Sequence, residues 1–159
     1  RVLFRSNLNG DNFNFDHFVE RQFMVLKVRT LFHRLASQLI KEKKNDKAKE
    51  VLDRCIEIMP DHKIAFDYEI IPLIDDYFRI NEMEKGNQIA NQLIDNYIEQ
   101  LTYFQQFKGS KAMLIDRDIK IALYVLQNMY SIALQYNQEA IIKKVEPILK
   151  NNIDKLKFE

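Results

Sequence analysis

The side chains most able to do chemistry in this chain are three histidines, one cysteine and several carboxylates. The histidines are His17, His33 and His62, and their spacing matches neither the H-x3-H nor the H-E-x-x-H pattern of zinc sites. Cys55 is the only cysteine, so no cysteine pair completes a tetrahedral set, and no carboxylate does so either. We therefore expect no metal and no other cofactor, and a buried, unreactive Cys55.

A pair of carboxylates able to hydrolyse a glycosidic bond is also missing. The best candidates, Asp75 and Asp76, are consecutive and would project about 100° apart on a helix, so they cannot face one another across a bond. The chain has no glycine-rich phosphate loop, no G-x-S-x-G elbow and no cysteine with a recognisable histidine partner. Triads can still form from distant positions that a sequence does not reveal. The sequence predicts a chain that is not an enzyme.

The composition predicts helices throughout. Among 159 residues there are only three Gly and three Pro, which are the residues that turns and sheets require. Lys and Arg number 24 against 23 Asp and Glu, so no global field attracts nucleic acid. The longest apolar run, residues 119–134, is broken by polar side chains and is shorter than the roughly 20 residues that cross a bilayer. We expect an all-α chain without a transmembrane segment and without affinity for nucleic acid.

The apolar pattern divides the first half of the chain into a lead-in and two helices. Residues 1–15 show no sustained period, and Asp16 can cap a first helix that extends to about residue 43. A polar turn follows. Asn45 or Asp46 can cap a second helix, which Pro60 ends.

Prolines and turn residues set the expected limits of the later helices. Pro72 fits only in the first turn of a helix, so the third helix should begin near Asp67 or kink there. A fourth helix spans about residues 83–107 and a fifth begins near Asp116. The turn at residues 137–139 leads into a sixth helix, which Pro147 interrupts.

Small and apolar residues in the stretch 31–60 recur at the spacing of a known repeat, W-x2-L-G-x2-Y, then A-x3-F, then P. The matching residues are Phe32, Leu35, Ala36, Leu39, Ala48, Leu52 and Pro60. The chain thus resembles tetratricopeptide proteins. This resemblance implies a right-handed stack of antiparallel helix pairs with about six or seven helices, in a single domain over residues 16–159. The expected units are repeat one (29–62), repeat two (about 67–108) and a degenerate capping repeat (about 116–157).

A longer match is similar to a narrower family. The run KAKEVLDRCIEIMPDHKIAFDYEIIPLIDDYF, followed by EKGNQIANQLIDNYIEQLTYFQQF and DIKIALYVLQNM, resembles the helical C-terminal domain of bacterial polytopic membrane proteins of unknown function. Those proteins are distantly related to protein O-mannosyltransferases. The resemblance covers about residues 7–150. The chain opens with Arg1 and has no signal sequence, so we expect a piece of a longer parent protein.

The narrower resemblance implies a membrane-anchored, glycosyltransferase-like parent that uses a lipid-linked sugar. This chain would be its soluble C-terminal tail on the periplasmic side, and a cytoplasmic location is the alternative. The acidic catalytic residues expected of such transferases lie in the membrane portion and have no counterpart here.

The first helix of each tetratricopeptide pair lines a concave face, and this places the candidate partner-binding groove. The groove residues are His33, Arg34, Ser37, Tyr68, Asp75 and Arg79. Folds of this kind hold polypeptides, so we expect a non-catalytic protein-interaction or scaffolding module. Its partner would be a protein or peptide segment, for which the membrane portion of its own parent is one candidate.

The alternative function is a carbohydrate-binding or glycan-processing domain that acts directly on sugar. It is suggested by a surplus of aromatic residues that could stack on sugar rings, although their helical spacing favours packing in the core. These residues are Tyr68, Tyr77, Phe78, Tyr97, Tyr103, Phe104 and Phe107.

Overall fold

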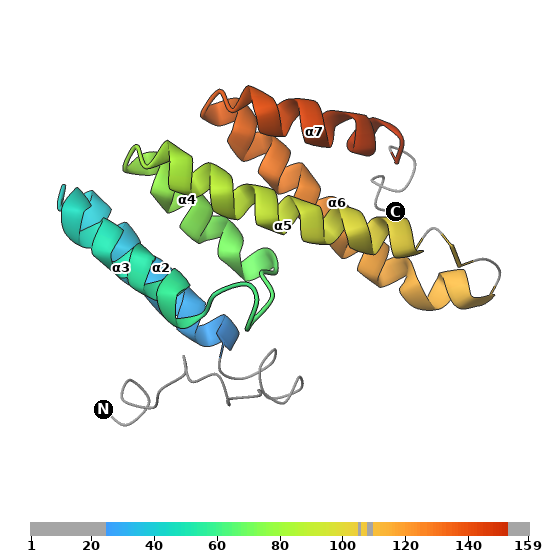
Figure 1. The fold of residues 1–159 in the computed structure, drawn as a ribbon, viewed down its shortest axis with the longest axis horizontal. Helices are drawn as coiled ribbons and strands as arrows, with labels where there is room; N and C mark the ends of the chain where they lie inside the picture. Colours follow the sequence, from blue (N-terminus) through green and yellow to red (C-terminus); the bar gives the residue numbers. More distant parts are fainter. Residues whose placement is uncertain (1–24, 105, 108–109, 153–159) are drawn as a thin grey trace. The chain divides into compact units, whose positions relative to one another are not determined.

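The computed structural model describes residues 25–104, 106–107 and 110–152, and this part of the chain consists of helices joined by turns and loops (Figure 1). It contains six α-helices and one short 3-10 helix, and no strand. The predicted all-α class is therefore confirmed. The chain divides into two compact units, Arg1–Asn81 and Glu82–Glu159. The lead-in, residues 1–15, and the start of the first predicted helix lie outside the described residues.

The first unit is built around one long helix that touches all the others. Its elements are α2 (Val25–Lys41), α3 (Asn45–Ile58), the 3-10 helix η2 (Tyr68–Ile70) and α4 (Ile71–Arg79). Helix α2 packs against α3, η2 and α4. The side chains enclosed between them are mostly aliphatic. They include Ala36, Ala48, Leu52, Cys55, Ile70, Leu73, Ile74 and Tyr77.

The connection between α2 and α3 is short and tightly hydrogen-bonded. Lys43 has a positive φ of 59°, and the amides of Lys43 and Lys44 donate to carbonyls of the last turn of α2 at 2.9 Å. The predicted turn is therefore confirmed, but the predicted cap is wrong. Asn45 and Asp46 lie inside α3, and the residue before the helix is Lys44, which makes no side-chain capping bond.

The third helical segment begins at a position that places Pro72 within its first turns, as proline chemistry requires. The Asp67 side chain accepts a hydrogen bond from the amide of Glu69 at 3.1 Å and so caps η2. Pro72 follows in the first turn of α4, where its missing amide has no partner to lose. The predicted start near Asp67 is confirmed.

The second unit consists of three helices, α5 (Met83–Phe104), α6 (Ser110–Gln135) and α7 (Glu139–Lys150). Helix α6 packs against both α5 and α7. Its core contains Ile89, Ala90, Leu93, Ile94, Leu123, Leu126, Met129, Ile141 and Val145. Within the described residues of the chain, no helix is both long and apolar enough to span a bilayer.

Three predicted limits in the second unit differ from the structure. Helix α5 ends at Phe104, so Phe107 lies beyond it. Helix α6 begins at Ser110, ahead of Asp116, because residues 111–114 include strong helix formers. Pro147 lies within α7, which continues to Lys150, and the amide of Asn151 bonds to the Pro147 carbonyl at 3.1 Å. The turn expected at residues 137–139 is confirmed by Asn137, with φ of 56°.

Ala36 is fully buried in the first unit, as the repeat spacing predicted. Replacing it with phenylalanine should lower the free energy of unfolding by about 1–3 kcal/mol, because a large side chain overpacks a closed contact. Urea unfolding followed by circular dichroism measures the change. Leu35→Phe is the control, since Leu35 is exposed and should tolerate a larger side chain. An unchanged midpoint for Ala36→Phe would show that this site can expand.

Cys55 is a free, fully buried thiol, as predicted. Burial raises its pKa to about 12, whereas an exposed thiol ionises near pH ~8.5. Above that unfolded value the unfolded chain loses a proton that the folded chain keeps. The free energy of unfolding should therefore fall as the pH rises from about 8.5 toward 12, and below that range this group has no effect.

The size of this effect can be isolated with Cys55→Ala. Between about pH 7.5 and about pH 9.5, wild type should lose about 1.4 kcal/mol more stability than the variant, because only wild type contains the thiol. Urea titrations at both pH values give the two differences, and other titrating groups cancel between the proteins. Identical pH dependence in the two proteins would contradict the buried, neutral thiol.

Candidate functional site

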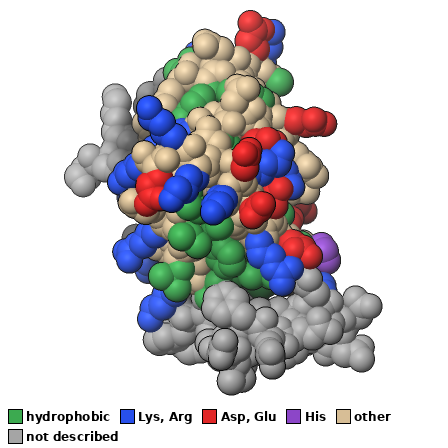
Figure 2. Space-filling view, turned by 90° about the vertical axis from the view of Figure 1, so that its left-hand side faces the viewer, with side chains coloured by type: hydrophobic (Ala, Val, Ile, Leu, Met, Phe, Trp, Pro, Cys, Tyr) green, Lys and Arg blue, Asp and Glu red, His purple; other side chains and the backbone are tan. Residues whose placement is uncertain are grey.

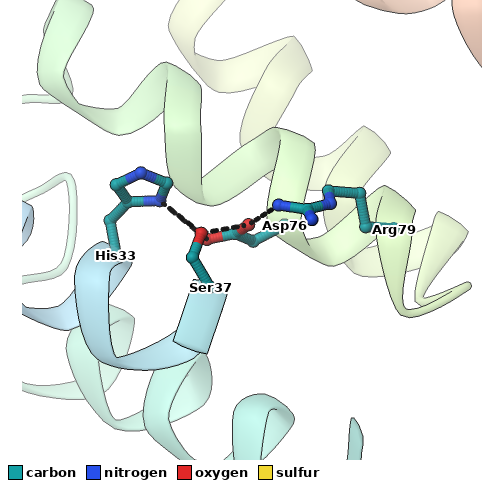
Figure 3. Close-up of polar contacts among 4 residues, drawn as sticks. All are labelled: His33, Ser37, Asp76 and Arg79. Carbon is teal, nitrogen blue, oxygen red and sulfur yellow. Dashed lines mark hydrogen bonds and ion pairs between the residues drawn. The ribbon is translucent and has the colours of Figure 1, made fainter. Parts of the chain in front are cut away.

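The carboxylate of Asp76, on α4, is fully buried and collects three polar side chains from two helices (Figure 3). His33 Nδ1 lies 2.7 Å from Asp76 Oδ2. Ser37 Oγ donates to Oδ1 at 3.0 Å, and Arg79 Nη1 donates to the same oxygen at 3.1 Å. We call these four residues the Asp76 cluster.

Helical spacing explains how the cluster assembles. His33 and Ser37 are four residues apart on α2, and Asp76 and Arg79 are three residues apart on α4, so each pair lies on one face of its helix. Because α2 packs against α4, the two faces meet. A buried carboxylate is stable only when hydrogen-bond donors replace its water. Asp76 has such donors on both oxygens, and the cluster therefore ties α2 to α4.

The cluster contains a serine, a histidine and an aspartate, but their geometry differs from that of a catalytic triad. In a triad the serine and the aspartate contact opposite nitrogens of the imidazole. Here Ser37 Oγ is 3.5 Å from His33 Nδ1, the same nitrogen that contacts Asp76. The Ser37 hydroxyl donates its proton to the carboxylate instead. In this arrangement His33 cannot take that proton, so Ser37 is not activated as a nucleophile.

The six predicted groove residues fall into two groups. Three of them, His33, Ser37 and Arg79, belong to the Asp76 cluster. The other three lie outside it: Arg34 and Tyr68 are exposed, and Asp75 is half-buried. The residue that joins the first group was not among the six, because the prediction chose Asp75 where the structure uses Asp76. That these side chains bind a partner stays a prediction.

A second buried charge, Arg29, holds the loop before η2 against α2. Its side chain is fully buried, and Nη2 donates to the carbonyl oxygen of Ile64 at 2.9 Å. Nη1 lies 3.4 Å from the Ala65 carbonyl oxygen and 3.5 Å from Asp67 Oδ1. The guanidinium also lies 5.3 Å from the ring centroid of Phe66, within cation–π range.

Burial dominates the electrostatics of Arg29. Desolvation lowers the pKa of its guanidinium, and the nearby Asp67 carboxylate opposes this shift. Among the described residues, Nε has no hydrogen-bond partner. Sequence analysis did not identify this residue, although its place seven positions before Ala36, on the same helical face, indicated a core site.

Three of the seven aromatic residues proposed for sugar stacking are in the core. Tyr77, Phe78 and Tyr97 are buried, and the Tyr77 hydroxyl donates to Asp53 at 2.9 Å. Core packing is therefore confirmed for these three. Tyr68 and Tyr103 remain exposed.

No group of three or more His, Cys, Asp or Glu side chains in the described part of the chain could hold a metal ion. Comparison of the chain with protein-family models, with curated proteins and with solved structures finds no match. The Asp76 cluster itself presents two partly exposed polar side chains, with 30% of His33 and 36% of Arg79 accessible to solvent.

Proposed function

We propose that this chain is a non-catalytic protein-interaction module whose α2–α4 face holds a protein or peptide segment. The Asp76 cluster is the observation that carries the proposal. The buried carboxylate fixes His33 and Arg79 while about a third of each side chain stays exposed, at 30% and 36%. Donors that are already fixed lose little entropy when a partner binds, which favours recognition.

The proposed architecture is the tetratricopeptide-like, right-handed stack of antiparallel helix pairs. The packing of α2 against both α3 and α4 supports it, because the first helix of one repeat must touch its own partner and the first helix of the next repeat. In that arrangement Arg34, Tyr68 and Asp75 extend the Asp76 cluster into a partner-binding groove.

The proposed context is the soluble tail of a membrane-anchored, glycosyltransferase-like bacterial parent, on its periplasmic side. This part of the proposal is supported by the sequence resemblance of residues 47–78 and the two runs that follow it. The partner would then be the membrane portion of the parent or the protein that receives the sugar.

The test compares partner capture by the full chain and by an Arg34→Gln, Arg79→Gln double variant. The matched control is Arg54→Gln, Arg117→Gln, which removes the same charge from exposed positions outside the groove. Exposed ion pairs contribute about 0–1 kcal/mol each, so affinity for partners among membrane or periplasmic proteins should fall by up to about thirtyfold in the groove variant only. Equal recovery of every partner by all three proteins would rule out this face.

The second candidate function, direct binding or processing of sugar, is favoured by the exposed rings of Tyr68 and Tyr103. Exposed aromatic rings stack on the apolar faces of sugars. Binding of glycans by the full chain, lost in Tyr68→Ala or Tyr103→Ala, would support this candidate. Turnover of a lipid-linked sugar by the chain alone would overturn the non-catalytic proposal.

A further inference from the structure

The outward side of α2 carries two leucines beside a row of basic residues. Leu31 and Leu35 are one helical turn apart, and 60% and 51% of their surfaces are exposed. Lys27, Arg34 and Lys41 are all exposed and follow one another at intervals of seven residues, or about two turns. They therefore line up along the helix next to the leucines. We call these five residues the leucine–basic face.

Two of its basic residues have no charged partner among the described residues. Neither Arg34 nor Lys41 forms a hydrogen bond or an ion pair through its side chain in the part of the chain that the structure describes. Surface cations on other helices do pair with carboxylates. They include Arg54, Lys120, Lys143 and Lys150. An acidic partner would therefore find two unpaired positive charges on α2, those of Arg34 and Lys41.

Figure 2 views the side on which α2 and α3 lie, where hydrophobic side chains gather with lysine and arginine side chains around them and several aspartate and glutamate side chains among these. Leucines at i and i+4 beside basic residues at seven-residue spacing match the pattern of one half of a helix–helix seam. The complementary half is a helix with an apolar stripe and an acidic row. Opposite charges at the flanks of such a seam set the choice and orientation of the partner.

We propose that the leucine–basic face binds an amphipathic helix of another protein, with acidic residues alongside its apolar stripe. The proposal rests on the proposed protein-interaction function, but at a face separate from the α2–α4 site, and adds the chemistry of the partner. A second copy of this chain fits poorly, because a symmetric pairing would place Arg34 against Arg34 and Lys27 against Lys41. An anionic membrane fits less well, because the face exposes two leucines and no aromatic anchor.

The test uses two labelled synthetic helices of about three heptads with leucine at the core positions. One carries glutamate at the flanking positions and the other lysine. Fluorescence anisotropy with the full chain should show binding of the glutamate peptide at least about tenfold tighter than that of the lysine peptide. Arg34→Glu with Lys41→Glu should reverse this preference, and Leu31→Gln with Leu35→Gln should weaken binding about tenfold or more.

The chain offers matched controls in its second unit. Tyr124→Gln with Leu134→Gln removes two large side chains of similar exposure, 52% and 50%, and should leave binding unchanged. Arg117→Glu with Lys143→Glu makes the same charge change as the basic-row variant at other exposed positions. Loss of binding in either control would mean that the peptide does not select the leucine–basic face, and would overturn the proposal.

Other occupants of the face would give different results, each of which overturns the proposal. A dimer that Leu31→Gln with Leu35→Gln dissociates in light scattering would identify a second copy. Binding to phosphatidylserine vesicles that the same variant loses, without peptide binding, would identify a membrane. A marked fall in the melting temperature of this variant would show that the chain's own residues outside the described part cover the leucines.

Arg79→Gln separates this inference from the proposed α2–α4 site. It should leave affinity for the glutamate peptide unchanged, because Arg79 is not part of the leucine–basic face. Peptide binding that depends on Arg79 and not on the leucines would overturn this inference and leave the α2–α4 site standing. The opposite outcome is peptide binding that requires the leucines, with partner capture by the Arg79 variant equal to that by wild type. This pair of results would support this inference and rule out the α2–α4 site.

Discussion

Replacing Arg29 with alanine should lower the free energy of unfolding by about 3–5 kcal/mol. Arg29 is fully buried, and its guanidinium donates to the carbonyl oxygens of Ile64 and Ala65. Without it both carbonyls lose a donor, and a cavity opens beside the ring of Phe66. Urea unfolding followed by circular dichroism measures the loss.

Two further variants separate the sources of this effect. Arg34→Ala, at an exposed position on the same helix, should change stability by no more than about 0.5 kcal/mol. Arg29→Met keeps much of the buried volume and removes the desolvated charge, so it should be less destabilising than Arg29→Ala. A loss below about 1 kcal/mol for Arg29→Ala would contradict the role assigned to this side chain.

The features that the sequence predicted correctly are those set by local chemistry. A proline ring can begin a helix but cannot continue one without losing a hydrogen bond, which placed Pro72 in the first turn of α4. The polar residues at the end of α2 predicted a turn, and Lys43 makes it with a positive φ. The apolar period of 3.6 residues predicted the burial of Ala36 and Ala48.

The two buried charges depend on partners far along the chain. Arg29 donates to a carbonyl 35 residues away, and His33 contacts Asp76 across 43 residues. No pattern within one helix shows such a contact. The position of a residue within its helix gives only a weaker indication, namely that a charged residue occupies a core site. Arg29 is such a residue, because it lies on the same helical face as the buried Ala36.

The exchange of Asp75 for Asp76 has a specific cause. Adjacent residues point about 100° apart on a helix, so the starting phase of α4 decides which carboxylate turns toward α2. That phase is set by the 3-10 turn η2, whose residues advance by a different angle from those of an α-helix. Periodicity alone does not fix it. Asp76 does, however, follow the buried Leu73 by three residues, and this spacing indicated the inner face.

Asp76→Asn should lower the free energy of unfolding by about 2–3 kcal/mol, because three donors lose a charged acceptor. The asparagine amide must also turn its NH2 group toward at least one of those donors. Arg79 donates to one carboxylate oxygen and His33 contacts the other, while Ser37 can donate to either. An asparagine that keeps the Arg79 bond therefore turns its NH2 group toward His33 Nδ1, which must then accept instead of donate. The smaller desolvation of a neutral amide offsets part of the loss.

Asp75→Asn is the matched control, since it makes the same chemical change one residue away at a half-buried position. Its effect should stay within about 1 kcal/mol. Ser37→Ala, which removes one donor and leaves the carboxylate, should fall between the two, at about 1 kcal/mol. Equal urea midpoints for Asp76→Asn and wild type would show that the carboxylate does not hold α2 and α4 together. His33 and Arg79 would then lack the group that positions them. The proposed binding face would lose its physical basis.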